Sequence, residues 1–250
     1  MKKILFILPF LLSVNVVFAQ KELKEGSFTY KFSDIKVKKG KRDPIETPKM
    51  YNGAEMTVYF NTRKQRIDMD FMDGFIKTQV FINLKEKTAR HFTNVMKEKR
   101  ETTGMDSIYR YELKNIDKNA QKATKLKSTG KTKDILGYKC EEFVFTQNMN
   151  DKIITSTMYI TKDFKINKNV WKSATIANII LPMPSNSNLE GFPMEIVVDD
   201  DEMSVTMLVS KIEKKEKSIF DVPEGYYKID INELRNAPPL PPPPAPKDGY

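Results

Sequence analysis

The sequence predicts a mainly β protein with a single β-rich domain and one or two short helices. Apolar and polar residues alternate along most of the chain, and this period of two is typical of strands with one buried face. Short polar segments that suit hairpin turns, such as Asn148–Asp151, separate the alternating stretches. The 250 residues, of which 40% are hydrophobic, are enough to build one substantial core.

Most of the expected strands lie in the first half of the chain. The first stretch, Gly26–Ile35, places three aromatic side chains on one side. The stretches that follow place an apolar row on one face and a polar row on the other. They are Glu55–Asn61, Gln65–Phe71, Ile76–Leu84, Thr88–Val95 and Tyr109–Leu113.

Two hairpins and a short helix are expected in the second half. The hairpin strands are Tyr138–Gln147 with Lys152–Thr161, and Phe192–Asp199 with Met203–Lys211. Between the hairpins, the apolar residues of Asn169–Ile180 follow the spacing of a helix. The segment Ile219–Tyr226 is expected to form an apolar anchor followed by a turn.

Residues 1–19 have the pattern of a signal peptide. Lys2 and Lys3 precede an apolar run, and Val17 and Ala19 place small side chains before an expected cleavage after Ala19. No later stretch approaches the ~20 apolar residues of a transmembrane helix. We therefore expect an exported protein that is periplasmic or secreted.

The rest of the chain is expected to be one domain, residues 20–235, with two segments outside its core. Residues 36–48 are basic and contain Pro44 and Pro48, which predicts a mobile insert. Residues 236–250 form a proline-rich tail, because proline lacks the donors for a sheet and favours polyproline II geometry. Such a tail is either a stiff spacer or a ligand for an aromatic groove.

The net charge of +9 favours acidic partners such as lipid headgroups or nucleic acid. The lysines are nevertheless dispersed, and many stand beside Glu or Asp, as in a solubilising surface. Export also argues against nucleic acid, so we expect no nucleic-acid partner.

Residues that commonly carry catalysis are scarce. Cys140 is the single cysteine and His91 the single histidine, which leaves no intramolecular disulfide and too few ligands for a typical zinc site. Cys140 lies on the apolar side of its stretch, and we expect a buried thiol. His91 has no local signature of a nucleophile beside it. We expect no catalytic residue and therefore no enzyme.

Two groups of acidic residues are candidates for a hard cation. They are Asp68, Asp70 and Asp73, and the run Asp199–Glu202. Neither has the spacing of an EF-hand loop. A solvated strand face and a polar hairpin tip account for them, so we expect no metal and no cofactor.

The second half also contains sequence elements of a known family. Asp134–Glu142 (DILGYKCEE), Met158–Asp163 (MYITKD), Gly191–Met194 (GFPM) and Phe220–Tyr226 (FDVPEGY) occur in this order. In these elements the chain resembles DUF4412, a family of exported bacterial proteins of unknown function, over roughly residues 130–226. It is more weakly similar to the GLPGLI family of exported Bacteroidetes proteins. The resemblance implies a single curved antiparallel sheet or half-barrel, as in periplasmic lipoprotein carriers, and supplies no catalytic residues.

Two functions are compatible with these features. The first is non-catalytic binding of a lipid or acyl ligand in the cavity of a curved sheet, because methionine adapts to irregular apolar ligands. Candidate lining residues are Met56, Val58, Phe60, Ile67, Met69, Phe71, Val80 and Ile82. A packed core would use the same residues in the same way. The alternative is a module for envelope protein–protein interaction that uses the basic surface and the proline-rich tail.

Overall fold

A computed structural model describes residues 21–38, 43, 45–51, 53–111, 126–149, 152–167, 170, 191–213 and 217–236. The strands are β1 (Lys21–Leu23), β2 (Gly26–Val37), β3 (Glu55–Phe60), β4 (Lys64–Phe71), β5 (Ile76–Asn83), β6 (Thr88–Val95), β7 (Glu98–Thr103), β8 (Lys127–Ile135), β9 (Tyr138–Met149), β10 (Lys152–Thr161), β11 (Phe164–Ile166), β12 (Phe192–Asp199), β13 (Met203–Glu213) and β14 (Tyr227–Asp230). The helical elements are α1 (Glu46–Tyr51), the 3-10 turn η1 (Lys217–Phe220) and α4 (Ile231–Asn236), and residues 105–111 are also helical.

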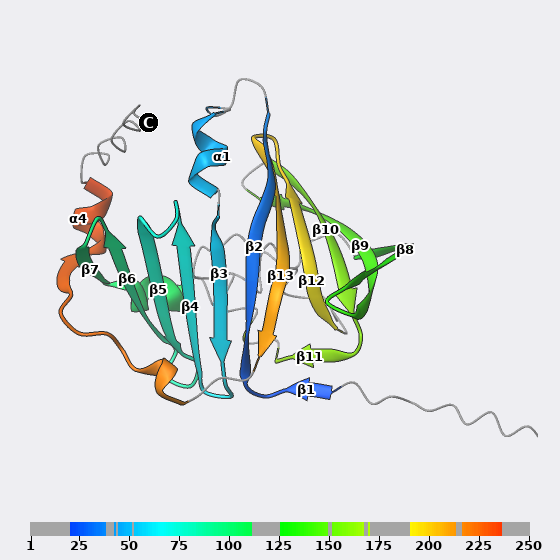
Figure 1. The fold of residues 1–250 in the computed structure, drawn as a ribbon. Helices are drawn as coiled ribbons and strands as arrows, with labels where there is room; N and C mark the ends of the chain where they lie inside the picture. The colour runs from blue at the N-terminus through cyan, green and yellow to red at the C-terminus, as the bar shows by residue number, and fades with distance from the viewer. Residues whose placement is uncertain are drawn as a thin grey trace, which may run out of the picture.

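Twelve strands form one large sheet in the order β14-β7-β6-β5-β4-β3-β2-β13-β12-β10-β9-β8. All neighbours pair antiparallel except β14 and β7, and β1 pairs with β11 in a separate parallel ribbon. The sheet curves without closing into a barrel, and β14 and β8 are its edges (Figure 1). This confirms the predicted fold class, a mainly β domain with a single curved, mostly antiparallel sheet.

Asn and Asp side chains shape several of the hairpin turns. Asn61 accepts hydrogen bonds from the backbone N–H groups of Arg63 and Lys64 at 2.8 and 2.7 Å. Asp200 accepts from Glu202 and Met203 at 2.7 Å each. A side-chain oxygen that binds the backbone two and three residues ahead reverses the chain locally. The acidic run after β12 is thus a polar hairpin tip, as expected.

The main hydrophobic cluster covers one face of the sheet, which we call the inner face. It contains residues from both halves of the chain, from Phe28 on β2 to Val209 on β13. Tyr30 is fully buried there, and its hydroxyl donates a hydrogen bond of 2.6 Å to the carbonyl oxygen of Pro193. Because β13 lies between β2 and β12, this bond joins two strands that are not neighbours.

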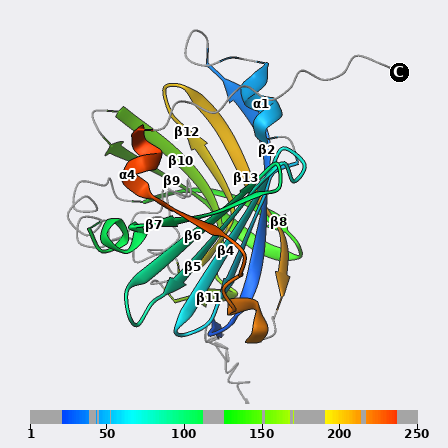
Figure 2. The ribbon, with the colours of Figure 1, turned by 90° about the vertical axis from the view of Figure 1, so that its left-hand side faces the viewer.

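A second, smaller apolar contact lies on the outer face of β4–β7. Residues 217–226 cross this face before β14 pairs with β7 (Figure 2). The ring of Tyr226 packs edge-on against Phe92 with centroids 5.1 Å apart, and Phe92 meets Phe81 in the same way at 5.6 Å. Arg66 donates to the carbonyl of Ile219 at 2.9 Å. The expected anchor at residues 219–226 therefore contacts the back of the sheet.

The expected strand at Tyr109–Leu113 is wrong. The strand in this region is β7, and residues 105–111 are helical, with Tyr109 buried. The sequence of β7, EKRETT, has no apolar alternation and so gives no periodic signal. Pairing with β6 on one side and β14 on the other holds this strand in the sheet. The side chain of Asp106 also accepts a hydrogen bond of 2.6 Å from the N–H of Ala89, which ties the helical segment to β6.

Several predicted segments lie wholly or partly outside the described residues. The signal peptide, residues 169 and 171–180 of the expected helix and residues 237–250 of the tail are outside. In the segment predicted to be a mobile insert, Lys36 and Val37 end β2 and residues 46–48 begin α1. Residues 39–42 and 44 of that segment are not described, and its mobility stays a prediction.

Candidate hydrophobic ligand site

All eight predicted lining residues lie together on the inner face of β3, β4 and β5. The strand register pairs Met56 with Met69, and Val58 with Ile67. Ile67 in turn pairs with Val80 on β5. Six of the eight are at most 2% exposed, and Met69 and Phe71 are half-buried against the same hydrophobic cluster. Their grouping on one face therefore agrees with the alternation pattern, and their role as ligand contacts stays a prediction.

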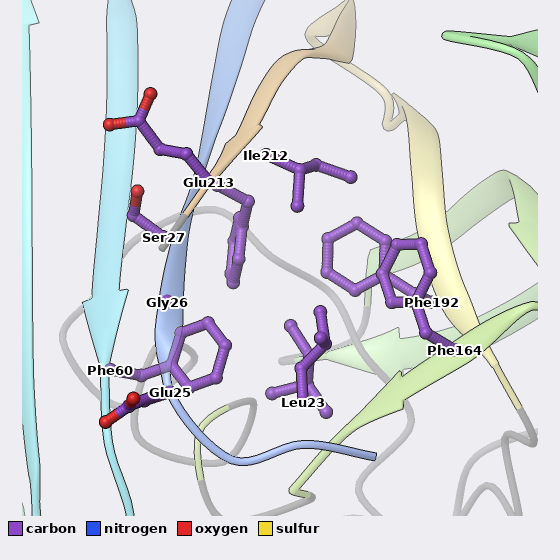
Figure 3. A pocket seen from close by; sticks show the side chains of 11 residues that line it. Leu23, Glu25, Gly26, Ser27, Phe60, Phe164, Phe192, Ile212 and Glu213 are labelled. Carbon is purple, nitrogen blue, oxygen red and sulfur yellow. The ribbon is translucent and has the colours of Figure 1, made fainter. Parts of the chain in front are cut away.

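A cavity of about 270 Å³ lies at the end of the sheet where the β1–β11 ribbon meets β2, β3, β12 and the end of β13. Its walls come from the β1–β2 connection, β3, β11, β12 and the end of β13 (Figure 3). The lining residues are Leu23, Glu25, Gly26, Ser27, Phe28, Phe60, Phe164, Ile166, Phe192, Ile212 and Glu213. Phe60 is the one member of the predicted set that lines this cavity.

Four phenylalanine rings build most of the cavity wall. Phe28 and Phe192 pack edge to face with centroids 5.1 Å apart, and Phe164 and Phe192 lie 5.0 Å apart. Phe28 and Phe60 are 6.0 Å apart. These separations lie in the range favoured by aromatic pairs. The wall is therefore an interlocked aromatic cluster, and a ligand in the cavity would contact ring faces and edges.

Two glycines let the strands approach closely enough to form this wall. Gly26 has a φ of +150°, and a Cβ there would lie 2.9 Å from the carbonyl oxygen of Glu213. Gly191 has a φ of +141°, and a Cβ there would lie 2.3 Å from the carbonyl oxygen of Thr161. Both conformations favour glycine. Gly191 directly precedes Phe192, so the close approach to β10 sets the position of that ring.

The interior of the cavity is apolar although two glutamates line it. The carboxylates of Glu25 and Glu213 point away from the rings, toward the opposite side of β2 (Figure 3). Glu213 also forms an ion pair with Lys211. The side chains that face the interior are aromatic or aliphatic, so the cavity suits a hydrocarbon group and offers no charge to a polar one.

The single cysteine and the single histidine both lie on strands of the large sheet, Cys140 on β9 and His91 on β6. Cys140 is fully buried, as expected, and burial raises the pKa of its thiol to about 11. His91 lies opposite Val80 on β5, and its Nδ1 is 3.3 Å from the hydroxyl of Thr102. Burial lowers the pKa of the His91 imidazole. Both groups are therefore held in their neutral forms near pH 7.

A polar network that the sequence analysis missed attaches the edge strand β8 to the sheet. Glu142 is 5% exposed, accepts hydrogen bonds from Tyr159 and Thr129, and forms a 3.2 Å ion pair with Lys131. The hydrogen bond to Glu142 is the main cause that raises the pKa of Tyr159 to about 12. Lys133 lies 3.9 Å from the centroid of the Tyr159 ring. The buried carboxylate is thus fully partnered, which is the state of a structural group.

Two of the remaining acidic candidates, Asp68 and Asp70, form ion pairs with neighbouring strand residues. Asp68 binds Arg66 at 2.6 Å, and Asp70 lies 3.1 Å from Lys77. Within the part of the chain that the structure describes, no group of three or more His, Cys, Asp or Glu side chains is placed to hold a metal ion.

Comparison with known proteins identifies one family and several distant structures. The model of DUF4412, a domain of unknown function, matches residues 45–226. No curated protein matches the chain. Among the described residues, no helix is long and apolar enough to cross a membrane.

The similar solved structures have low sequence identity. PNGF-II is 15% identical at a TM-score of 0.38, and the match covers 86% of this chain and 33% of that one, so this chain spans about a third of its length. The Mycobacterium tuberculosis lipoprotein LppX is 11% identical at a TM-score of 0.42, with 78% of this chain and 89% of that one covered. LprF from Mycobacterium bovis is 10% identical at a TM-score of 0.38, with 80% and 90% covered.

Proposed function

The chain belongs to the DUF4412 family, whose function is unknown, and we propose that it binds a hydrophobic ligand, an acyl chain, without catalysing a reaction. The observation that carries the proposal is the apolar cavity of about 270 Å³ between β1, β2, β11, β12 and β13. An apolar pocket of this size leaves aromatic and aliphatic surface without packing partners, which forfeits dispersion and transfer free energy unless something fills it. A hydrocarbon group would recover that free energy.

The size and lining of the cavity favour the end of an acyl chain over a compact polar metabolite. An engineered apolar cavity of ~150 Å³ binds benzene, and the cavity here is larger. Sites for drug-sized ligands begin at roughly 300 Å³ and contain a few convergent polar groups. This interior has none, so each bound methylene contributes about 0.8 kcal/mol of transfer free energy and little else holds the ligand.

The proposed place of action is the cell envelope. The signal-peptide pattern of residues 1–19 supports export, and acyl groups are abundant in envelope lipids and lipoproteins. Binding without chemistry is supported by the buried, neutral thiol of Cys140 and by the fully partnered carboxylate of Glu142.

The test compares two tryptophan substitutions on β13. Ile212→Trp fills the cavity from its wall, whereas Leu208→Trp adds the same bulk on the opposite, 37% exposed face. Native mass spectrometry of the gently purified mature chain, and titration with a fluorescent fatty acid, measure binding. We expect acyl binding by the natural protein and by Leu208→Trp, and a loss of about tenfold or more in Ile212→Trp. Thermal unfolding of both variants identifies any loss of fold.

A protein that emerges at its bare mass and binds no fatty acid would rule out the acyl ligand. The envelope interaction module, with the basic surface and the proline-rich tail as contacts, would then be the better hypothesis. Equal binding by Ile212→Trp and Leu208→Trp would show that the ligand sits elsewhere.

A further inference from the structure

Exposed apolar side chains gather at the end of the sheet opposite the cavity. Phe60 at the cavity is the last residue of β3, and the chain enters β3 at the far end through α1. We define the apolar rim at that end as Ile45, Met50, Met72 and Met96. Ile45, Met50 and Met96 are 64%, 48% and 60% exposed, and Met72 is half-buried. In Figure 1 the rim corresponds to α1 and the upper turns of β4–β7.

Direct contacts join the three segments of the rim. The N–H of Met96, in the β6–β7 turn, donates to the carbonyl of Phe75 in the β4–β5 turn at 3.4 Å. Phe75 in turn donates to the carbonyl of Met72 at 3.1 Å. The ring of Tyr51, at the end of α1, packs edge-on against Phe71 with centroids 6.0 Å apart. The rim is therefore one surface, and both views place its turns beside α1 (Figures 1 and 2).

Both hairpin tips hold methionine where turn geometry favours other residues. Met96 and Lys97 are the two residues between β6 and β7, with φ of +51° and +75°. Met72 begins the β4–β5 turn with a φ of +54°. Two-residue turns with positive φ at both positions strongly prefer Asn-Gly. Methionine at these positions costs conformational free energy, and sparsely populated backbone conformations cluster at functional sites.

Charged side chains of both signs lie beside the rim. Lys77 pairs with Asp70 at 3.1 Å across β4 and β5, and Arg100 pairs with Glu98 on β7. Exposed Lys97 and Asp73 stand next to Met96 and Met72 in the two turns. An acidic or basic partner would therefore gain little from long-range attraction at this end of the molecule. The surface offers apolar side chains on protruding turns, and burial of these side chains is its main source of binding free energy.

We propose that the apolar rim docks on the surface of a lipid bilayer. Three neighbouring protrusions from one end of the sheet can each insert between headgroups, which a flat protein partner would not accommodate equally well. Unbranched thioether side chains adapt to disordered acyl chains, and interfacial segments bury their apolar face ~5–10 Å into the headgroup boundary. The proposal does not depend on the cavity ligand, because rim and cavity lie at opposite ends of the sheet.

The test measures flotation of the mature chain with phosphatidylcholine vesicles, which carry no net charge and no free acyl ligand. We expect the natural protein to float with the vesicles and Met96→Asn to lower its partition coefficient by about tenfold. Asn is the preferred residue at this position of the turn, so the variant should unfold at the same or a higher temperature. Lost binding with retained stability separates docking from folding.

The matched control is Leu136→Asn. Leu136 is 52% exposed and has a φ of +50° in the β8–β9 turn, so the substitution is chemically equivalent but lies away from the rim. We expect this variant to float like the natural protein, and salt to change the binding little. Absent flotation of the natural protein, or equal losses in both variants, would overturn the proposal. Binding that needs anionic lipids and disappears in salt would also overturn it. So would a rim that binds a protein partner but no vesicles.

Discussion

Substitution of Gly191 by alanine tests the strand contact that shapes the cavity wall. The added Cβ would lie 2.3 Å from the carbonyl oxygen of Thr161 and 2.7 Å from Cγ2 of Ile160. The oxygen belongs to the backbone of β10, so it cannot rotate away as a side chain could. Relief of the overlap therefore requires β12 to move from β10.

The expected cost has two parts. A φ of +141° is sparsely populated for a residue with a side chain, which costs about 1–3 kcal/mol. Overpacking against a fixed backbone typically adds about 1–3 kcal/mol. The free energy of unfolding should therefore fall by about 2–6 kcal/mol, a large share of the 5–15 kcal/mol typical of a domain.

Gly137→Ala is the control for the steric part of this cost. Gly137 also has a positive φ, +79°, but no atom lies within 4 Å of the position that its Cβ would take. Its substitution should cost only the conformational part, about 1–2 kcal/mol. Urea titration followed by circular dichroism measures both variants. Equal losses would refute the close approach of Gly191 to β10, and with it our explanation of how Phe192 is positioned.

Three further predictions concern buried groups. Tyr30→Phe removes the 2.6 Å hydrogen bond to the carbonyl of Pro193, so urea titration should show a loss of about 0.5–1.5 kcal/mol, and no loss would contradict the bond. Because burial lowers the pKa of His91, the unfolded chain binds its proton first as the pH falls below 6.5. The unfolding free energy should therefore fall from pH 7 to pH 5.5, and less steeply in His91→Gln; identical slopes would show that His91 is not buried in its neutral form. The Cys140 thiol, with a pKa of about 11, should react with an aromatic disulfide reagent at pH 8 far more slowly in the folded protein than in urea, and equal rates would contradict its burial.

The alternation pattern located the strands that bury one face. The stretches predicted for β2–β6, β9, β10, β12 and β13 agree with the structure to within about two residues at their ends. Each of these strands packs an apolar row on the inner face or pairs with one that does, so its side chains carry the period of two. The same pattern also placed the eight candidate lining residues on one face.

The strands that the pattern missed are held by backbone hydrogen bonds more than by side-chain burial. β7 is polar throughout, β8 is exposed over most of its length, and β1 and β11 have three residues each. A short or polar strand carries no periodic signal, because its place depends on a neighbouring strand that supplies hydrogen-bond partners. That neighbour is distant in sequence for β1, which pairs with β11 more than 140 residues later.

By itself, the sequence determined the mainly β class, the inward direction of the apolar side chains on most strands and the scarcity of catalytic groups. These properties are local, because alternation and composition act within a few residues. Only the tertiary structure decided where the cavity and the rim lie. The cavity needs Leu23, Phe60 and Phe192 to meet, and the rim needs Met72 and Met96 at one end of the sheet. Strand order and register bring these residues together, and both depend on contacts between segments that are far apart in the chain.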